Sequence, residues 1–374
     1  MIRTSRYLLS LFSCHCAVNG FAAIDSGWDT RIYDQLPHLP PLGTCPSALK
    51  GEEAEVGRRA GRSNVTAGDK YSKPDARVRL FCFYGVADSA VSLRKWVSSA
   101  PHWLEARVVE LPGHGYLTDG LPSCSKQVSE PRSISDIEEQ RHGLVKSLAD
   151  QVEPLLVNKS GEHVPYSFCG FSFGALNAYL LCQELKTRNI PPPVVLFACG
   201  RGAPHVMPYC TQLQRDMQLW NDEEMLNYVE TRLGLMTSNI QDNRRERMAS
   251  LLRCGMLFSC IYVGEEPTKD KTPNLGDSAD ILWDEDDRPV PFAQNAPVLD
   301  CSVVSITGSR DTTWPPRLVG RWRDVSGRHY QHCCFDLAHA QLMNSEQTRD
   351  LVFDELLARL LRYKVVDVVD SNLA

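Results

Sequence analysis

The sequence contains a serine between two glycines, in the pattern Gly170-x-Ser172-x-Gly174, which is typical of a nucleophilic serine. Residues 165–169 before it fit a short buried strand, and residues 175–181 after it fit a helix. A sharp turn between a strand and a helix holds such a serine in a strained backbone conformation, and the small flanking residues keep the two elements from colliding. The N-terminus of the helix then directs free N–H groups at the reacting centre. We therefore interpret Ser172 as a catalytic nucleophile.

A serine nucleophile needs a base, and a carboxylate must orient that base. In the strand–turn–helix setting, the order along the chain is serine, acid, histidine. Asp311 follows a strand-like run and a glycine turn, and His339 follows the last strand-like run. We therefore expect Ser172, Asp311 and His339 to form a catalytic triad, although a turn-forming Asp311 and a helix-capping His339 are the structural alternatives. His332, inside an apolar strand run, is the rival base; Asp336 is the rival acid but lies too near His339 in sequence for the usual geometry.

The oxyanion of such a reaction needs two backbone N–H groups. We expect one from Phe173, the residue after the nucleophile, and the other from the loop after the first strand, around residues 85–87. His114, in the sequence Pro-Gly-His-Gly, is a further candidate for the catalytic base, but we interpret it as a turn residue.

Strand-like and helix-like segments alternate along most of the chain. This alternation indicates an α/β protein with a mostly parallel, doubly wound sheet. Ser135 and Asn221 are the expected N-caps of two of the helices. The expected strands are residues 78–83, 106–111, 165–170, 193–199, 302–306 and 331–336.

The composition of the segments suggests how the chain is divided. Residues 25 to about 76 are rich in Pro, Gly and charge, so we expect residues 1–76 to be a poorly ordered leader or linker before one folded domain at 77–364. Helical patterns without strands at about 205–263 predict a lid inserted on the sheet. Residues 264–291 are polar and acidic and are expected to be a mobile loop. Residues 365–374 follow the last predicted helix as a tail.

The overall charge and hydropathy exclude several function classes. The 374 residues are 43% hydrophobic and 23% charged, with a formal net charge of -6. This balance gives no sign of nucleic-acid binding, and no Lys/Arg run suggests an anionic membrane surface. No apolar stretch approaches the roughly 18 residues of a membrane span.

The 14 cysteines include no C-x-x-C pair, and none of them has zinc-finger spacing, so we expect no metal site. Cys82, Cys169, Cys199 and Cys301 lie in strand-like runs, where cysteines are usually small buried hydrophobes of a reducing compartment. We therefore expect a cytoplasmic protein. The first 24 residues lack acidic side chains and include an apolar run, which leaves an organelle or secretory leader open.

Three segments resemble the type II thioesterases, the stand-alone α/β-hydrolase enzymes of polyketide, nonribosomal peptide and fatty acid synthesis. The similarity covers about residues 78–363, and the last of the three motifs is specific among α/β hydrolases. The segments are residues 80–96 (Leu80-Phe81-Cys82-Phe83, Ser89-Ala90 and Arg94-Lys95-Trp96), residues 111–115 (Leu-Pro-Gly-His-Gly) and residues 199–205 (Cys-Gly-Arg-Gly-Ala-Pro-His).

The resemblance implies an α/β hydrolase that hydrolyses acyl groups from the phosphopantetheine thioester of an acyl carrier protein or carrier domain, through an acyl-Ser172 intermediate. We expect a monomer and no cofactor, the acyl group being carried on the phosphopantetheine of the partner. It also implies that Val86 supplies the second oxyanion N–H. The sequence departs from the family pattern at Tyr84, where the family has proline, and at residues 87–88, where it has Gly-Gly. Asp88 would be unfavourable near an oxyanion unless it points away. A carboxylesterase or lipase, and a non-catalytic acyl-binding homologue, are the alternative functions.

Overall fold

The fold was derived from a computed structural model of the chain. All described residues belong to the unit that begins at Pro37. Most of the predicted leader, residues 1–64, lies outside them. The described residues are 65–66, 73, 76–86, 88–114, 121–206, 211–233, 240–261, 263, 282–283, 289–290, 295–344 and 346–371.

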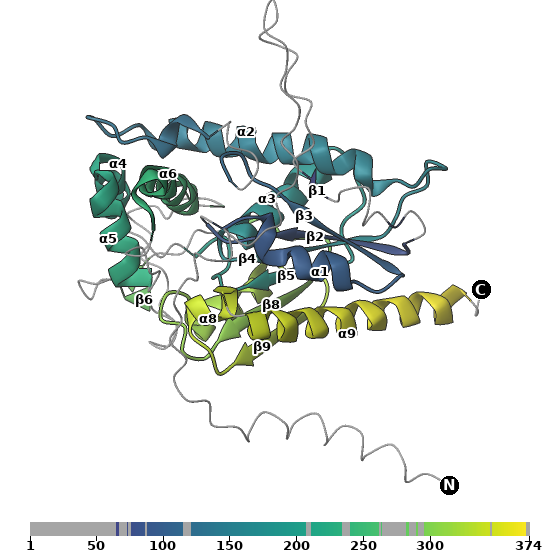
Figure 1. Ribbon diagram of the computed structural model, residues 1–374. Coiled ribbons are helices and arrows are strands. Elements are labelled where there is room, and N and C mark those ends of the chain that lie inside the picture. The colour runs from purple at the N-terminus through teal and green to yellow at the C-terminus, as the bar shows by residue number, and fades with distance from the viewer. Residues whose placement is uncertain are drawn as a thin grey trace, which may run out of the picture. The chain divides into compact units, whose positions relative to one another are not determined.

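A seven-stranded sheet in the order β1-β3-β2-β4-β5-β8-β9 forms the centre of this unit (Figure 1). The short strand β1 pairs antiparallel with β3, and the remaining strands run parallel to their neighbours. This arrangement confirms the predicted mostly parallel, doubly wound sheet. The strands are β1 (Val65–Thr66), β2 (Val78–Phe83), β3 (Leu104–Val109), β4 (Tyr166–Phe171), β5 (Val195–Cys199), β8 (Ser302–Gly308) and β9 (Tyr330–Phe335).

Helices cover both faces of the sheet (Figure 1). On one face α2 (Ile134–Val152) packs on α3 (Phe173–Thr187). On the other, α1 (Arg94–Ser99) and α9 (Glu346–Ser371) meet where the rings of Trp96 and Phe353 stack with their centroids 4.9 Å apart. The shorter helices are η3 (Ala90–Leu93), η4 (Ser123–Ser125), η5 (Glu153–Leu156), α7 (Pro316–Val319), η7 (Gly320–Val325) and α8 (His339–Asn344).

Every residue of β2, β4, β5 and β8 is buried, as expected for parallel strands that helices cover on both sides. The cysteines predicted to be core residues follow this rule, since Cys82, Cys169, Cys199 and Cys301 are all fully buried. In contrast, β9 is an edge strand and alternates between exposed and half-buried residues. The sequence pattern had indicated an apolar run for this last strand. The local pattern did not indicate its edge position, because that position depends on which strands pair.

Two helix starts test the predicted N-caps. The Asn221 Oδ1 accepts from the Glu224 N–H at 2.9 Å and the Glu224 carboxylate accepts from the Asn221 N–H, which confirms Asn221 as a cap. The predicted cap at Ser135 is wrong by two positions. Ser133 caps α2, because its hydroxyl accepts from the Asp136 N–H at 3.1 Å while the Asp136 carboxylate reaches back to the Ser133 N–H.

Between β5 and β8 the chain forms a helical insertion of α4 (Thr211–Leu219), α5 (Asp222–Leu233) and α6 (Asp242–Ser259). The buried guanidinium of Arg253 holds it together, donating to the Met217 carbonyl on α4 and to the Asp222 carboxylate on α5. The sequence had indicated two of these helices; α4 is short and polar. Among the described residues, none of the helices is long and apolar enough to cross a bilayer.

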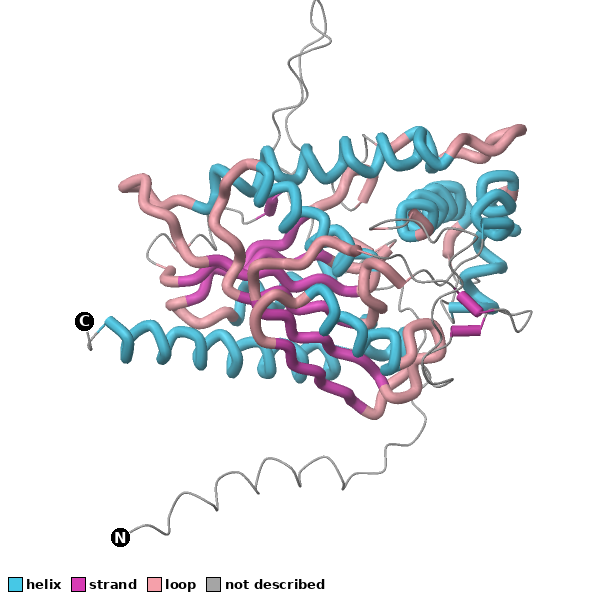
Figure 2. Tube along the Cα trace, turned by 180° about the vertical axis from the view of Figure 1, so that it is seen from behind, coloured by secondary structure: helices cyan, strands magenta, loops and turns pink. Residues whose placement is uncertain are grey.

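The predicted acidic loop at 264–291 lies mostly outside the described residues. Within it, β6 (Leu282–Trp283) and β7 (Pro289–Val290) pair antiparallel, which the sequence had not indicated (Figure 2). At the other end of the chain, α9 continues past the expected end of the last helix, so the predicted tail at 365–374 is helical as far as Ser371.

Candidate active site

Ser172 lies at the turn between β4 and α3, with φ 48° and ψ -115°. A positive φ is costly for a residue that carries a side chain, so the turn is strained as predicted. The two flanking glycines make it possible. A Cβ at Gly170 would lie 2.4 Å from the backbone of Ala175, and a Cβ at Gly174 would lie 2.5 Å from the Phe83 carbonyl oxygen. Neither position therefore accepts a side chain without moving the strand or the helix.

Asp311 and His339 are joined by a hydrogen bond of 2.7 Å between Oδ2 and Nδ1. Asp311 follows β8 and His339 begins α8 after the adjacent β9, so two neighbouring strands bring them together. Both side chains are buried. Because an ionised carboxylate can only accept, Nδ1 carries the proton, and in the neutral ring Nε2 keeps a lone pair. The other carboxylate oxygen of Asp311 accepts from the Trp314 N–H at 2.8 Å, which fixes the carboxylate in place.

The end of β5 connects Ser172 with this acid–base pair. The Ser172 N–H donates to the Cys199 carbonyl at 2.7 Å. The next residue, Gly200, has φ 58°, and a Cβ there would lie 3.7 Å from Cε1 of His339. The three predicted site residues thus gather at the carboxyl ends of β4, β5, β8 and β9.

The rival residues have other partners. His332 lies in the middle of β9, and its Nδ1 is 2.8 Å from Oγ of Ser305 on the neighbouring β8. Partial burial lowers the pKa of this imidazole. Asp336 is exposed and forms an ion pair of 3.0 Å with Arg310. The structure therefore places a carboxylate against His339 and a hydroxyl against His332.

The two predicted oxyanion donors lie on the segments that follow β4 and β2. Phe173 is the first residue of α3, where an N–H has no acceptor within the helix. Val86 lies in the loop after β2, next to Ala87, which is outside the described residues. Their side chains meet at α6, because a Cβ at Gly255 would lie 2.4 Å from Cγ2 of Val86 and 3.6 Å from Cδ1 of Phe173. The helical insertion thus packs directly against both predicted donors, and Ser172 is only 8% exposed.

Polar residues for which no role was predicted lie in the loop after β2 and at the end of β3. The Tyr84 hydroxyl donates to Glu110 at 2.8 Å, and both side chains are fully buried. The signal for Glu110 was a carboxylate at the end of an otherwise apolar run. The Asp88 carboxylate accepts from the Ser89 N–H at 2.7 Å, so it engages the start of η3. Burial raises the pKa of Asp88, and hydrogen bonds from Ser89 and Ser92 oppose that rise.

His114 is buried in the turn after β3, in agreement with its interpretation as a turn residue. Its Nδ1 donates to the Pro112 carbonyl at 3.0 Å, and its ring packs against Tyr84 with the centroids 5.5 Å apart. Burial lowers the pKa of His114 to about 4, so the ring is neutral at physiological pH. Gly115 and the five residues after it are outside the described residues.

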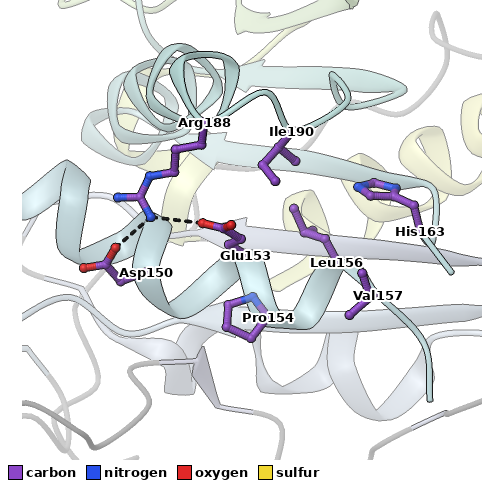
Figure 3. A pocket seen from close by; sticks show the side chains of 8 residues that line it. All are labelled: Asp150, Glu153, Pro154, Leu156, Val157, His163, Arg188 and Ile190. Carbon is purple, nitrogen blue, oxygen red and sulfur yellow. Dashed lines mark hydrogen bonds and ion pairs between the residues drawn. The ribbon is translucent and has the colours of Figure 1, made fainter. Parts of the chain in front are cut away.

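A separate surface pocket lies near the amino ends of β4 and β5. It is lined by the end of α2 and by residues of the segments that lead into these two strands (Figure 3). Arg188 on its wall pairs with Asp150 at 2.7 Å and with Glu153 at 3.1 Å, so its charge is compensated. No group of histidine, cysteine and acidic side chains suited to a metal ion occurs among the residues that the structure describes.

Comparisons with known proteins concern the sequence and the fold. No family model matches the chain. It is 22% identical over 271 residues to the gramicidin S biosynthesis protein GrsT of Aneurinibacillus migulanus, covering 72% of this chain and 85% of that protein. It is 24% identical over 159 residues to the medium-chain S-acyl fatty acid synthase thioesterase of Homo sapiens. That match covers 42% of this chain and 52% of the human protein.

Among solved structures, the type II thioesterase BorB from the borrelidin biosynthetic cluster superposes with a TM-score of 0.52. The two sequences are 18% identical, and the match covers 80% of this chain and 98% of BorB. At this identity the likeness concerns the fold. The chain has the α/β-hydrolase fold, and it is similar to the type II thioesterases in both sequence and fold.

Proposed function

We propose that the protein is a serine thioesterase that removes acyl groups from the phosphopantetheine thioester of an acyl carrier protein or carrier domain. The observation that carries this proposal is the 2.7 Å hydrogen bond between Asp311 and His339, at the sheet edge where Ser172 occupies its strained turn. The names of the relatives support the substrate class, since one is a fatty acid synthase thioesterase and another is a gramicidin S biosynthesis protein. Editing or chain release in such a synthesis is the proposed role.

In the first half of the reaction, Nε2 of His339 takes the proton of the Ser172 hydroxyl as Oγ attacks the thioester carbonyl. The oxyanion is stabilised by the backbone N–H groups of Phe173 and Val86. The carbon–sulfur bond then breaks, His339 returns the proton to the sulfur, and the pantetheine thiol leaves. The acyl group is now an ester of Ser172.

In the second half, a water molecule replaces the serine. His339 takes a proton from this water, which attacks the ester carbonyl, and the proton returns to Ser172 Oγ as the carboxylic acid leaves. Asp311 keeps the imidazole in the tautomer that exposes Nε2 and stabilises the imidazolium that forms in each half. The chemistry uses only the substrate, water and these side chains, so we propose that no cofactor takes part.

The segment at residues 199–205 and the helical insertion are our reasons for proposing a thioester on a carrier over a free ester, because the segment is similar to a motif of the type II thioesterases. The insertion packs α6 against Val86 and Phe173, the proposed oxyanion donors. A carboxylesterase would use the same three residues, and it is the second candidate that the experiment must separate. The carrier partner, a cytoplasmic location and a monomeric state remain predictions.

The test is a single-turnover reaction with an acyl carrier protein loaded with a medium-chain acyl group, followed by intact-protein mass spectrometry. Wild type should release the holo-carrier and show a transient acyl adduct on Ser172, and Ser172→Ala should do neither. Ser167→Ala is the matched control, because Ser167 is a fully buried serine of β4 one strand length before the turn. The proposal is wrong if wild type cleaves simple esters but leaves the acyl carrier intact.

A further inference from the structure

The loop from Tyr84 to Ser89 carries the proposed oxyanion donor Val86, and a buried carboxylate holds it at both ends. This carboxylate is Glu110, which follows β3 and has no exposed surface. The loop itself links β2 to η3. A short loop between two packed elements needs such anchors if one of its N–H groups is to keep a fixed direction.

Glu110 uses its two oxygens for the two ends of the loop. At the start, the Tyr84 hydroxyl donates to Oε1 at 2.8 Å. At the far end, the Ala90 N–H donates to Oε2 at 3.2 Å. The Tyr84 hydroxyl also accepts from the Leu111 N–H at 2.7 Å, which fixes the phenol between the loop and the strand end. One carboxylate therefore spans the segment that contains Val86.

The charges in this cluster suit these roles. Burial raises the pKa of Glu110, whereas the hydrogen bonds from Tyr84 and Ala90 lower it by stabilising the carboxylate. Burial and the neighbouring Glu110 raise the pKa of the Tyr84 phenol, so Tyr84 remains a donor. Asp88 and Arg247 also act on Glu110, the first raising its pKa and the second lowering it.

Two further contacts leave the loop little freedom. A Cβ at Gly174 would lie 2.5 Å from the Tyr84 carbonyl oxygen, so the N-terminus of α3 rests on the loop. On the other side, the Val86 side chain fills the space beside Gly255 of α6. The anchors at Tyr84 and Ala90 thus set the backbone of Val86 relative to Phe173, the other proposed donor.

We propose that Glu110, together with Tyr84, is a positioning residue that aims the Val86 N–H at the developing oxyanion. The inference rests on the proposed function, and it is particular to this chain because Tyr84 departs from the family pattern. Neither side chain touches the substrate. They act on the transition state through the loop, since an oxyanion exists only there.

The substitution Glu110→Gln releases one end of the loop. A glutamine keeps one carbonyl oxygen for the Tyr84 hydroxyl, but its NH₂ group then faces the Ala90 N–H, and two donors repel. Loss of a whole oxyanion donor lowers kcat by about 10²–10³. We expect a misaimed donor to lower kcat by roughly 10–100-fold with KM within about threefold. Tyr84→Phe should act in the same direction without introducing a clash.

Glu105→Gln is the matched control. Glu105 is buried near the start of β3, the strand that Glu110 follows. There it accepts from Arg79 at 2.9 Å and pairs with Arg107, at the end of β3 remote from the loop. It should lower the melting temperature at least as much as Glu110→Gln, because it leaves buried arginine charge uncompensated. Its kcat should stay near wild type. An equal loss of kcat in the control would mean that the effect of Glu110 is merely structural, which overturns the inference.

Kinetics with the acyl carrier and labelling of Ser172 by a fluorophosphonate separate the two proposals. A selective fall in kcat for Glu110→Gln and Tyr84→Phe supports the positioning role, and unchanged kcat in folded variants overturns it. If wild type does not hydrolyse the carrier but Ser172 is still labelled, the proposed function fails. Slower labelling of the two variants then still supports the positioning role, and equal labelling overturns it. An unreactive Ser172 in wild type overturns both.

Discussion

An asparagine in place of Asp311 would retain one contact of the carboxylate and reverse the other. The Trp314 N–H, now 2.8 Å from Oδ1, can still donate to the amide oxygen, so the loop after β8 keeps its anchor. The NH₂ group must then take the place of Oδ2, which lies 2.7 Å from Nδ1 of His339. Because NH₂ only donates, Nδ1 must become the acceptor, and the ring shifts to the tautomer with its proton on Nε2. That tautomer has no lone pair for the Ser172 proton.

The expected loss is large for activity and small for stability. The same tautomer error in a serine hydrolase costs about 10⁴ in kcat, which is roughly 5 kcal/mol of activation free energy. Asparagine matches aspartate in volume, and the Trp314 contact persists. The free energy of unfolding should therefore fall only by about 1.5–3 kcal/mol, the usual value of one hydrogen bond to a charged group.

The assay is kcat under saturating acyl carrier for Asp311→Asn, His339→Ala and His332→Ala, with urea unfolding of each variant. We expect the first two to lose activity and His332→Ala to keep it, since His332 contacts Ser305 rather than a carboxylate. A folded Asp311→Asn enzyme with more than about a tenth of wild-type kcat would refute the tautomer argument. Activity in His339→Ala together with its loss in His332→Ala would transfer the role of base to β9.

Three further predictions concern the residues that hold the fold together. Burial lowers the pKa of His114 to about 4, so the folded state binds fewer protons than the unfolded state, and wild type should lose about 2 kcal/mol of stability between pH 7 and pH 5. Urea titrations at both pH values should show a smaller loss for His114→Gln; equal losses would contradict the burial argument. Gly174→Ala should lower the melting temperature and kcat, because its Cβ would lie 2.5 Å from two carbonyl oxygens at the end of β2, whereas Gly143→Ala, with open space around it, should be neutral or stabilising. Arg253→Met should cost about 3–5 kcal/mol in urea unfolding, and the more exposed Arg245→Met about 1 kcal/mol or less; similar costs would mean that the buried contacts of α6 do not matter.

The strands were predictable because their signal is local. The predicted strand at 78–83 coincides with β2, and the run at 106–111 contains most of β3. The offset at β3 has a physical reason: Leu104 already pairs with Val78, whereas Glu110 lies beyond the strand. An apolar run marks burial, and the end of hydrogen bonding depends on the neighbouring strand.

The starts of the helices also include one that the local sequence predicts and one that it does not. Asn221 was predictable, because a cap residue followed three positions later by glutamate is a complete local signal. At α2 both Ser133 and Ser135 fit a cap, and the choice depends on which hydroxyl meets a free N–H. The pair of short strands at β6 and β7 had no signal in its polar surroundings.

The sequence by itself determined the order of the strands along the chain and the sharp turn at Ser172, since period, glycine spacing and turn chemistry are properties of neighbouring residues. It also limited the acid and the base to a few candidates. Only the tertiary structure decided which of them meet. His339 pairs with Asp311, and Glu110 supports Tyr84, because β8 lies beside β9 and β3 beside β2. Such contacts depend on strand order and burial, which join residues far apart in the chain and leave no local pattern.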